Sequence, residues 1–325
     1  MRIFFFVLIG VLAGSAMAVE AFTEAEIRAI LAHGPWPVAA TSDPTNIASG
    51  KREAIELGQR LFFDTRISGD GRFSCGSCHV PERNWTDNRT RGFAAAEVDR
   101  NTPTLMNVRL GRRFGWDGAG ENLWKQSIRP MLDRRELGAS PAHIAKLVRD
   151  DEQLACRYRK TFGHEASKSA EEVVLENVGK ALAAFQETFE TPPTPFDRFR
   201  NALARQQPSS YPDAARRGLR AFIANCSACH SGPNFSNGEL RDNGFTKDGP
   251  FKVPTLRHLM LTAPYGHHGG IETLTEVVRH YSDVGSKEIG PLKLSGAQQT
   301  DLVVFLESVS TLSNPWRPED HAECR

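Results

Sequence analysis

The sequence has almost no net charge, and it lacks a hydrophobic run long enough to span a bilayer. Its 325 residues carry 40 Lys and Arg against 39 Asp and Glu. The basic surface of a nucleic-acid-binding protein is therefore absent, which excludes that class. The strongly apolar run from Ile3 to Leu12 is too short for a comfortable transmembrane helix. Because it follows Arg2 and precedes an A-x-A motif at residues 16–18, it predicts an export signal over residues 1–18 and no membrane span after its removal.

Strand patterns are also scarce, whereas helical signals are frequent. Apolar positions recur with helical spacing from Val174 onward and again from Leu302 onward. Motifs that cap helix starts predict further boundaries at Thr23–Glu26, Ser140–Pro141, Ser169–Glu172 and Ser295–Gln298. Together with 27 Gly and 19 Pro, these patterns predict an all-α fold with long loops.

Four of the six cysteines form two C-x-x-C-H units, a spacing typical of c-type haem attachment. Two thiols of a unit can form thioethers with one haem, and the adjacent His can bind its iron. A thioredoxin-like motif would need no His and would not occur twice, whereas a zinc site or plain disulfides could also use these cysteines. For Cys156 and Cys324 two interpretations stay open, a mutual disulfide and two free thiols. The expected haem-binding residues are Cys75, Cys78, His79, Cys226, Cys229 and His230.

The chain contains a tandem repeat with an offset of 151 residues. Pro103 and Pro254 each lie 24 residues after a haem His, and Gly118 and Gly269 each lie 39 residues after it. Each half is therefore expected to hold one haem in an equivalent cradle. Since residues 191–195 form a Pro-rich break, the sequence predicts two tandem cytochrome c-like domains, one over residues 19–190 and one over residues 191–325.

The repeat also pairs Pro130 with Tyr281, each 51 residues after its haem His. A tyrosine oxygen can bind iron, whereas proline has no side-chain donor. We therefore expect haem 2 to be six-coordinate through His230 and Tyr281, and haem 1 to keep an open distal face where an oxidant can be activated. Nearby side chains that could bind iron instead are Met131, Met260 and His280.

Four further segments add to this pattern: Asn101–Thr104, Trp116–Gly118, Phe251–Arg257 and Leu261–Tyr265. Together with the paired C-x-x-C-H units, they resemble the bacterial dihaem cytochrome c peroxidase superfamily over nearly all of the mature chain, and most closely its methylamine-utilisation (MauG) members. Ordinary peroxidases of this family carry a distal His after the first unit and a Met on the second haem. Here residues 80–142 contain no His and position 281 is Tyr, and both departures match the MauG type.

The resemblance implies roles for further residues. Trp116 matches a tryptophan between the haems that can relay electrons; without the resemblance it would be interpreted as a core aromatic residue. Gln126, Pro130 and Glu136 match the distal pocket of haem 1, where a carboxyl can shuttle the proton that cleaves the O–O bond. Taken alone, Glu136 would be interpreted as a solvated helix charge.

The resemblance also implies one calcium ion between the haems, bound by an amide oxygen and backbone carbonyls. The matching residues are Asn101, Thr262 and Pro264, which would otherwise be interpreted as turn residues. The chain departs from the family at His268, where the family often has Asp, and at Ala224, where the MauG type has a surface tryptophan that draws electrons from its substrate. A long-range route must therefore leave by another path.

By this resemblance we expect a periplasmic, haem-dependent oxidoreductase. Hydrogen peroxide, or oxygen plus electrons, would drive oxidation of a protein at a distance, with charge shared through Trp116. The implied substrate is the precursor of methylamine dehydrogenase, in whose small subunit two tryptophans become tryptophan tryptophylquinone. A small electron-transfer protein, such as amicyanin or cytochrome c, is a further implied partner. Two rival functions stay open, a peroxide-scavenging dihaem peroxidase fed by a small cytochrome c or cupredoxin, and a dihaem electron carrier without catalysis.

Overall fold

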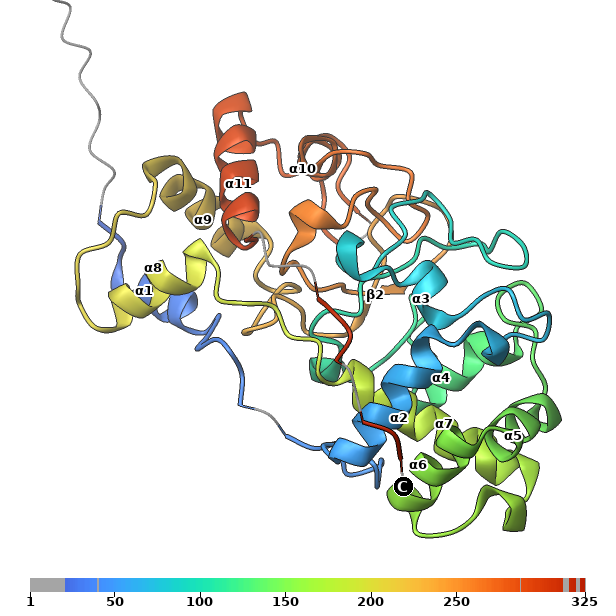
Figure 1. Ribbon diagram of the computed structural model, residues 1–325. Coiled ribbons are helices and arrows are strands. Elements are labelled where there is room, and N and C mark those ends of the chain that lie inside the picture. The colour runs from blue at the N-terminus through green and yellow to red at the C-terminus, as the bar shows by residue number, and fades with distance from the viewer. Residues whose placement is uncertain (1–20, 40, 287, 312–315, 320–321, 325) are drawn as a thin grey trace, which may run out of the picture.

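The computed structural model describes residues 21–39, 41–286, 288–311, 316–319 and 322–324. The predicted export signal, residues 1–18, lies outside the described residues. The fold is mostly helical, as predicted (Figure 1). Among the described residues, no helix is both long enough and apolar enough to cross a membrane.

The helices and strands have the following bounds. The α-helices are α1 Glu24–Leu31, α2 Arg52–Phe63, α3 Cys75–Cys78, α4 Leu123–Leu132, α5 Pro141–Asp150, α6 Glu152–Phe162, α7 Glu171–Gln186, α8 Pro195–Ala204, α9 Asp213–Asn225, α10 Leu274–Asp283 and α11 Gly296–Ser308. Short 3-10 helices are η1 Thr65–Ile67, η2 Pro81–Arg83, η3 Val108–Leu110, η4 Ala166–Lys168 and η5 Leu259–Leu261. The strands β1 Leu240–Arg241 and β2 Phe251–Lys252 pair antiparallel.

The two halves repeat the same local structure. Both ends of α4 and α10 differ by 151 residues, and so do both ends of η3 and η5. The isolated bridge between Phe114 and Gly120 recurs between Tyr265 and Ile271. The elements that carry Pro130 and Tyr281 are therefore equivalent in structure as well as in sequence.

Two large hydrophobic cores lie behind the haem-binding units. The first contains apolar side chains of α2 and α4–α7, and the second contains those of α8–α11. Each terminal segment packs on the other half of the chain. Ile30 of α1 belongs to the second core, and Trp316 near the C-terminus packs against the first. In Figure 1 the C-terminal segment accordingly ends beside α6. The domain boundary at residue 190 stays a prediction.

Three of the four predicted helix starts are confirmed. Thr23 and Ser295 form capping boxes, and Ser140 caps α5 with Pro141 in its first turn. The prediction for Ser169 is wrong, because α7 begins at Glu171 without a side-chain cap. The Ser169 hydroxyl instead bonds to the His164 ring and to the Glu165 carbonyl oxygen, at 3.0 and 3.2 Å.

Cys156 and Cys324 form a disulfide, which decides between the two interpretations of this pair. The bridge spans 168 residues and ties the C-terminal end to α6. The other four cysteines are free thiols in the two C-x-x-C-H units.

Candidate functional site

The first C-x-x-C-H unit is a single helical turn that turns its His toward a cavity. Ser74 and Ser77 close a capping box around α3, and His79 follows as the C-cap residue. The Nδ1 atom of His79 lies 3.0 Å from the carbonyl oxygen of Trp85. Because a carbonyl oxygen only accepts hydrogen bonds, Nδ1 must carry the proton. Nε2 is then unprotonated and has a lone pair that can bind a metal, the arrangement expected of a metal-binding imidazole.

The second unit repeats this geometry. The Nδ1 atom of His230 lies 3.0 Å from the carbonyl oxygen of Phe235. Phe235 and Trp85 both have the left-handed backbone conformation, with φ of 50° and 59°, which turns each carbonyl back toward its His. Burial lowers the pKa of His230 to about 4 and also lowers the pKa of His79, so both imidazoles are neutral and ready to bind iron.

Both units open into one cavity of about 1050 Å³. Single small-molecule sites occupy roughly 300–1,000 Å³, so this cavity exceeds that range. Two pairs of free thiols, each followed by a neutral His, face it from the two halves, and this donor set fits two c-type haems. Every site residue predicted from the sequence lines this cavity: Cys75, Cys78, His79, Asn101, Trp116, Gln126, Pro130, Glu136, Cys226, Cys229, His230, Thr262, Pro264 and Tyr281.

Pro130 and Tyr281 line the cavity from the equivalent helices α4 and α10. Burial raises the pKa of the Tyr281 hydroxyl, and no described residue forms a hydrogen bond with that oxygen. The rival ligands do not line the cavity: Met131 is fully buried in the first core, Met260 is 46% exposed, and His280 lies 3.2 Å from the carbonyl oxygen of Asn243. The Tyr281 assignment stays a prediction; of the α10 residues that line the cavity, it alone carries a side-chain oxygen or sulfur.

Gln126 lines the cavity from α4, as Pro130 does, and Glu136 lines it from the segment after α4. Gln126 accepts a 3.1 Å hydrogen bond from Arg129, whose guanidinium also pairs with Asp117. Among the described residues, no cation forms an ion pair or a hydrogen bond with Glu136. Burial, reinforced by the charge of Asp133, raises the pKa of Glu136, so its carboxyl holds a proton to higher pH than an exposed glutamate would.

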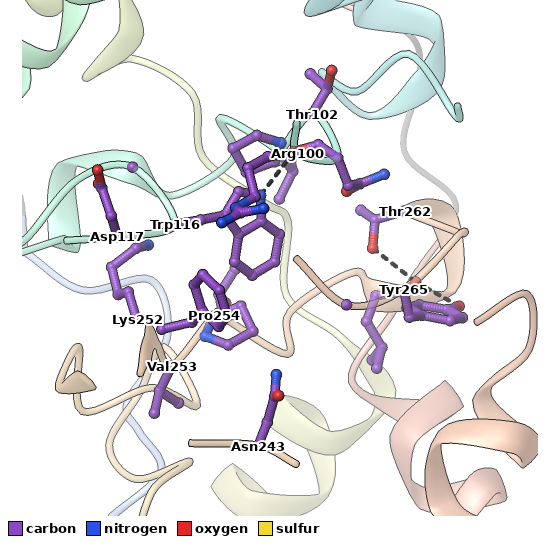
Figure 2. Close-up of a pocket in the computed structure, with 18 of the residues that line it drawn as sticks. Arg100, Thr102, Trp116, Asp117, Asn243, Lys252, Val253, Pro254, Thr262 and Tyr265 are labelled. Atoms are coloured by element: carbon purple, nitrogen blue, oxygen red, sulfur yellow. Dashed lines mark hydrogen bonds between the residues drawn. The ribbon is translucent and has the colours of Figure 1, made fainter. Parts of the chain in front are cut away.

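Trp116 is held by both halves of the chain. Its indole N–H donates a 2.8 Å hydrogen bond to the carbonyl oxygen of Asn101, and its own carbonyl accepts from the Lys252 amide at 2.8 Å. Figure 2 shows the Trp116 ring in the middle of the cavity wall, close to Lys252 and Pro254. The ring is half-buried and borders the cavity, a position that a relay between two cofactors requires.

The residues matched to a calcium site also line the cavity. Asn101 donates its side-chain amide to the Arg89 carbonyl oxygen at 2.7 Å, which leaves its Oδ1 atom as a hard oxygen donor. Thr262 and Pro264 face the cavity from the other half. No cluster of three His, Cys, Asp or Glu suited to a metal occurs in the described part of the chain, so an ion here would depend on amide and backbone oxygens.

Sequence reasoning missed two features of this wall. Lys252 lines the cavity, and burial lowers its pKa. His267 is fully buried, stacks on Phe251 at a centroid distance of 3.6 Å and lies 3.0 Å from the Thr246 hydroxyl. Lys252 lies in a motif that carries the resemblance and His267 lies two residues after another, but nothing in the pattern indicates which way their side chains point.

Comparison with known proteins supports the haem assignment. The di-haem cytochrome c peroxidase family matches residues 52–205. The methylamine utilization protein MauG of Methylorubrum extorquens is 34% identical over 284 residues, covering 79% of this chain and 78% of that protein. The cytochrome c551 peroxidase of Nitrosomonas europaea is 31% identical over 252 residues, covering 70% and 72%.

A solved structure agrees with these relatives. The structure of a MauG-like protein associated with microbial copper homeostasis has a TM-score of 0.71 at 25% identity, and covers 85% of this chain and 94% of that chain. Since relatives named for MauG and for peroxidase activity are almost equally similar, identity alone does not separate the two branches. It does show a haem-dependent enzyme whose family implies two c-type haems, and the chain belongs to the di-haem cytochrome c peroxidase family.

Proposed function

We propose that this enzyme is of the MauG type and oxidises a protein substrate at a distance. The observation that carries the proposal is the contrast between Pro130 and Tyr281, which occupy equivalent positions on α4 and α10 and line the same cavity. An oxygen donor at one position and no donor at the other would give the two haem sites different work. One site would stay open to an oxidant, and the other would be closed and suited to electron transfer.

The residues around the open site support this division. The bound haems would supply the redox chemistry. Glu136, with its raised pKa, would accept a proton from the incoming peroxide and return it to the leaving oxygen. Gln126, oriented by Arg129, would position the oxidant by hydrogen bonding. Trp116 would carry electrons between the two sites.

Calcium and location complete the proposal. One calcium ion would be bound near Trp116 by Asn101, Thr262 and Pro264. Because Asn101 also receives the Trp116 N–H, the ion would fix the position of the indole. The predicted export signal and the disulfide favour the periplasm, an oxidising compartment.

The proposed substrate is the precursor of methylamine dehydrogenase, and amicyanin or a small cytochrome c is the proposed redox partner. The second candidate is a peroxide-scavenging peroxidase, favoured by the similarity to a cytochrome c551 peroxidase. Residues 80–142 hold no His, so the distal His of such peroxidases is missing, and a Tyr ligand would make the second site a poor acceptor of electrons from a mild donor.

One experiment separates the two candidates. The haem-loaded enzyme is mixed with precursor methylamine dehydrogenase and hydrogen peroxide, and quinone absorbance is followed. Steady-state oxidation of reduced cytochrome c by peroxide is measured in parallel. Quinone formation with slow cytochrome turnover is the expected result, and fast cytochrome turnover without quinone would establish the peroxidase instead.

A further inference from the structure

Two tryptophans outside the cavity form a compact aromatic column. Trp85 is 3% exposed, and its ring centroid lies 5.3 Å from that of the half-buried Trp316. Phe189 stacks on Trp85 at 3.7 Å, and Phe63 stacks on Trp316 at 5.3 Å. Edge-to-face and offset-stacked contacts of this kind are the favourable aromatic geometries, so the column is well packed from the interior to the surface.

The inner end of the column touches the first haem unit. The carbonyl oxygen of Trp85 is the hydrogen-bond partner of His79, at 3.0 Å. The Trp85 ring also lies 5.7 Å from the ring of Phe62, which lines the cavity. Trp85 is thus joined to the proximal His both through the backbone and through ring packing.

Trp316, at the outer end of the column, belongs to the C-terminal segment of the chain. We call residues 316–319 and 322–324 the C-terminal strap. It lies across α2 and α6, where Gln59 donates to the Glu319 carbonyl oxygen at 2.8 Å and the buried Arg157 donates to the Ala322 carbonyl oxygen at 2.6 Å. The disulfide of Cys324 fastens its end to α6. These contacts hold Trp316 against the first core, although α11, the helix that precedes it in the chain, belongs to the second core.

The second haem unit has no matching column among the described residues. The residue whose carbonyl binds His230 is Phe235, and its ring stacks on the imidazole of His33 at 4.7 Å and contacts the rings of Phe196, Phe222 and Phe305. Phenylalanine and histidine are both harder to oxidise than tryptophan, so these rings offer no relay comparable to the column. Ala224 is exposed where the resemblance places a surface tryptophan, which leaves the second unit without that route as well.

We propose that Trp85 and Trp316 form an electron relay, in which Trp316 draws electrons from the protein substrate docked at the surface and Trp85 passes them to the first haem site. The inference rests on the proposed function. Electrons move inward one at a time: hydrogen peroxide reacting at the first haem site takes an electron from Trp85, which becomes a radical cation, Trp316 reduces Trp85, and the protein substrate reduces Trp316. Each indole keeps its N–H proton throughout. Two such electrons and two protons from solvent convert one hydrogen peroxide to two waters.

The test omits the protein substrate and any redox partner, so that an oxidised Trp316 cannot be reduced again and reacts with water. Loss of two electrons and two protons, with addition of one water oxygen, gives hydroxytryptophan, while peroxide accepts the electrons and protons. The loaded enzyme is treated with hydrogen peroxide under anaerobic conditions in water carrying heavy oxygen, and peptides are analysed by mass spectrometry. Trp124 is the internal control, because it is equally half-buried but lies on α4, outside the column.

We expect heavy oxygen at Trp316 well above its level at Trp124. Trp85→Phe keeps an aromatic ring but interrupts the relay, so labelling of Trp316 should fall to the level of Trp124, whereas Trp124→Phe should leave it unchanged. The double variant Cys156→Ser, Cys324→Ser releases the strap and should abolish the labelling too. Its cysteines lie outside both haem units, and an unchanged haem absorbance spectrum verifies loading in every variant.

Labelling of Trp316 that does not exceed that of Trp124, or that persists both in Trp85→Phe and in the released strap, would overturn the relay. The strap variant carries the test alone if Trp85→Phe does not fold. The assay needs no methylamine dehydrogenase. A labelled Trp316 without quinone formation would therefore reject only the proposed function, and quinone formation with an unlabelled Trp316 would reject only the relay.

Discussion

Gly58 of α2 lies directly against the carbonyl oxygen of Ala181 in α7, so closely that a Cβ atom on it would overlap that oxygen. Gly218 of α9 stands in the same relation to Asp301 of α11. We predict that Gly58→Ala and Gly218→Ala each lower the free energy of unfolding by about 1–3 kcal/mol, because overpacking forces the two helices apart. Urea unfolding followed by circular dichroism measures the change.

The control is Gly296→Ala in the first turn of α11, where a Cβ atom would meet nothing within 4 Å. That variant should be neutral or slightly more stable than the wild type. If Gly58→Ala matched it, the α2–α7 packing would have to be looser than the structure shows.

A second prediction concerns the pair of Arg257 and Asp197, which are 0% and 1% exposed and share two hydrogen bonds of 2.9 Å. Asp197→Ala leaves the guanidinium buried without its carboxylate, and should lower the free energy of unfolding by about 3–5 kcal/mol. Asp150→Ala is the control, since its pair with Lys146 is 60% and 76% exposed and should be worth only about 0.3–0.5 kcal/mol. Equal losses in the two variants would refute the buried-pair argument.

The same pair predicts a pH dependence. Burial alone would raise the pKa of Asp197, but the hydrogen bonds and charge of Arg257 outweigh it and hold the pKa below its usual value. A group whose pKa is lowered on folding stabilises the fold above its unfolded pKa of about 3.9. The stability difference between wild type and Asp197→Ala should therefore be constant above about pH 5, and should shrink as the pH falls through the folded-state pKa. A difference that grew toward acid pH would contradict this sign.

A third prediction addresses the division of work between the haem sites. Electron paramagnetic resonance of the ferric, loaded enzyme should show one high-spin and one low-spin signal. Tyr281→Phe removes the predicted oxygen ligand and should convert the low-spin signal to a high-spin one, whereas Tyr265→Phe should leave the low-spin signal unchanged. Tyr265 is a matched control, because it also lines the cavity while its hydroxyl donates to the Leu259 carbonyl oxygen at 3.0 Å. Two low-spin signals in the wild type would rule out the open site.

These sites show what the sequence predicts well. The repeat compares residues at short, fixed distances from each C-x-x-C-H unit, and local geometry follows such distances closely. The helices of Pro130 and Tyr281 therefore recur at the predicted offset of 151 residues.

Contacts between distant segments were not predictable in the same way. Cys156 and Cys324 are 168 residues apart, and sequence alone left their pairing open. The packing of Ile30 in the second core and of Trp316 against the first depends on where the chain ends fold back, and no periodic pattern records that. Ser169 fits a capping motif, yet a competing contact with His164 uses its hydroxyl.

The last prediction concerns Glu136. Glu136→Gln preserves the size and neutrality of the protonated side chain but cannot accept a proton, so the rate of reaction with hydrogen peroxide, measured by stopped-flow absorbance, should fall about 10²–10⁴-fold. In the proposed function, the ionised carboxylate of Glu136 is the proton acceptor in the wild type. The rate should therefore decrease as the pH falls through its pKa, which burial places above the usual value. The rate of Glu136→Gln should not show this decrease toward low pH. The control is Glu53→Gln, at an exposed position of α2, which should keep both the wild-type rate and its decrease toward low pH. An undiminished rate in Glu136→Gln would assign the proton transfer to solvent or to another group of the cavity.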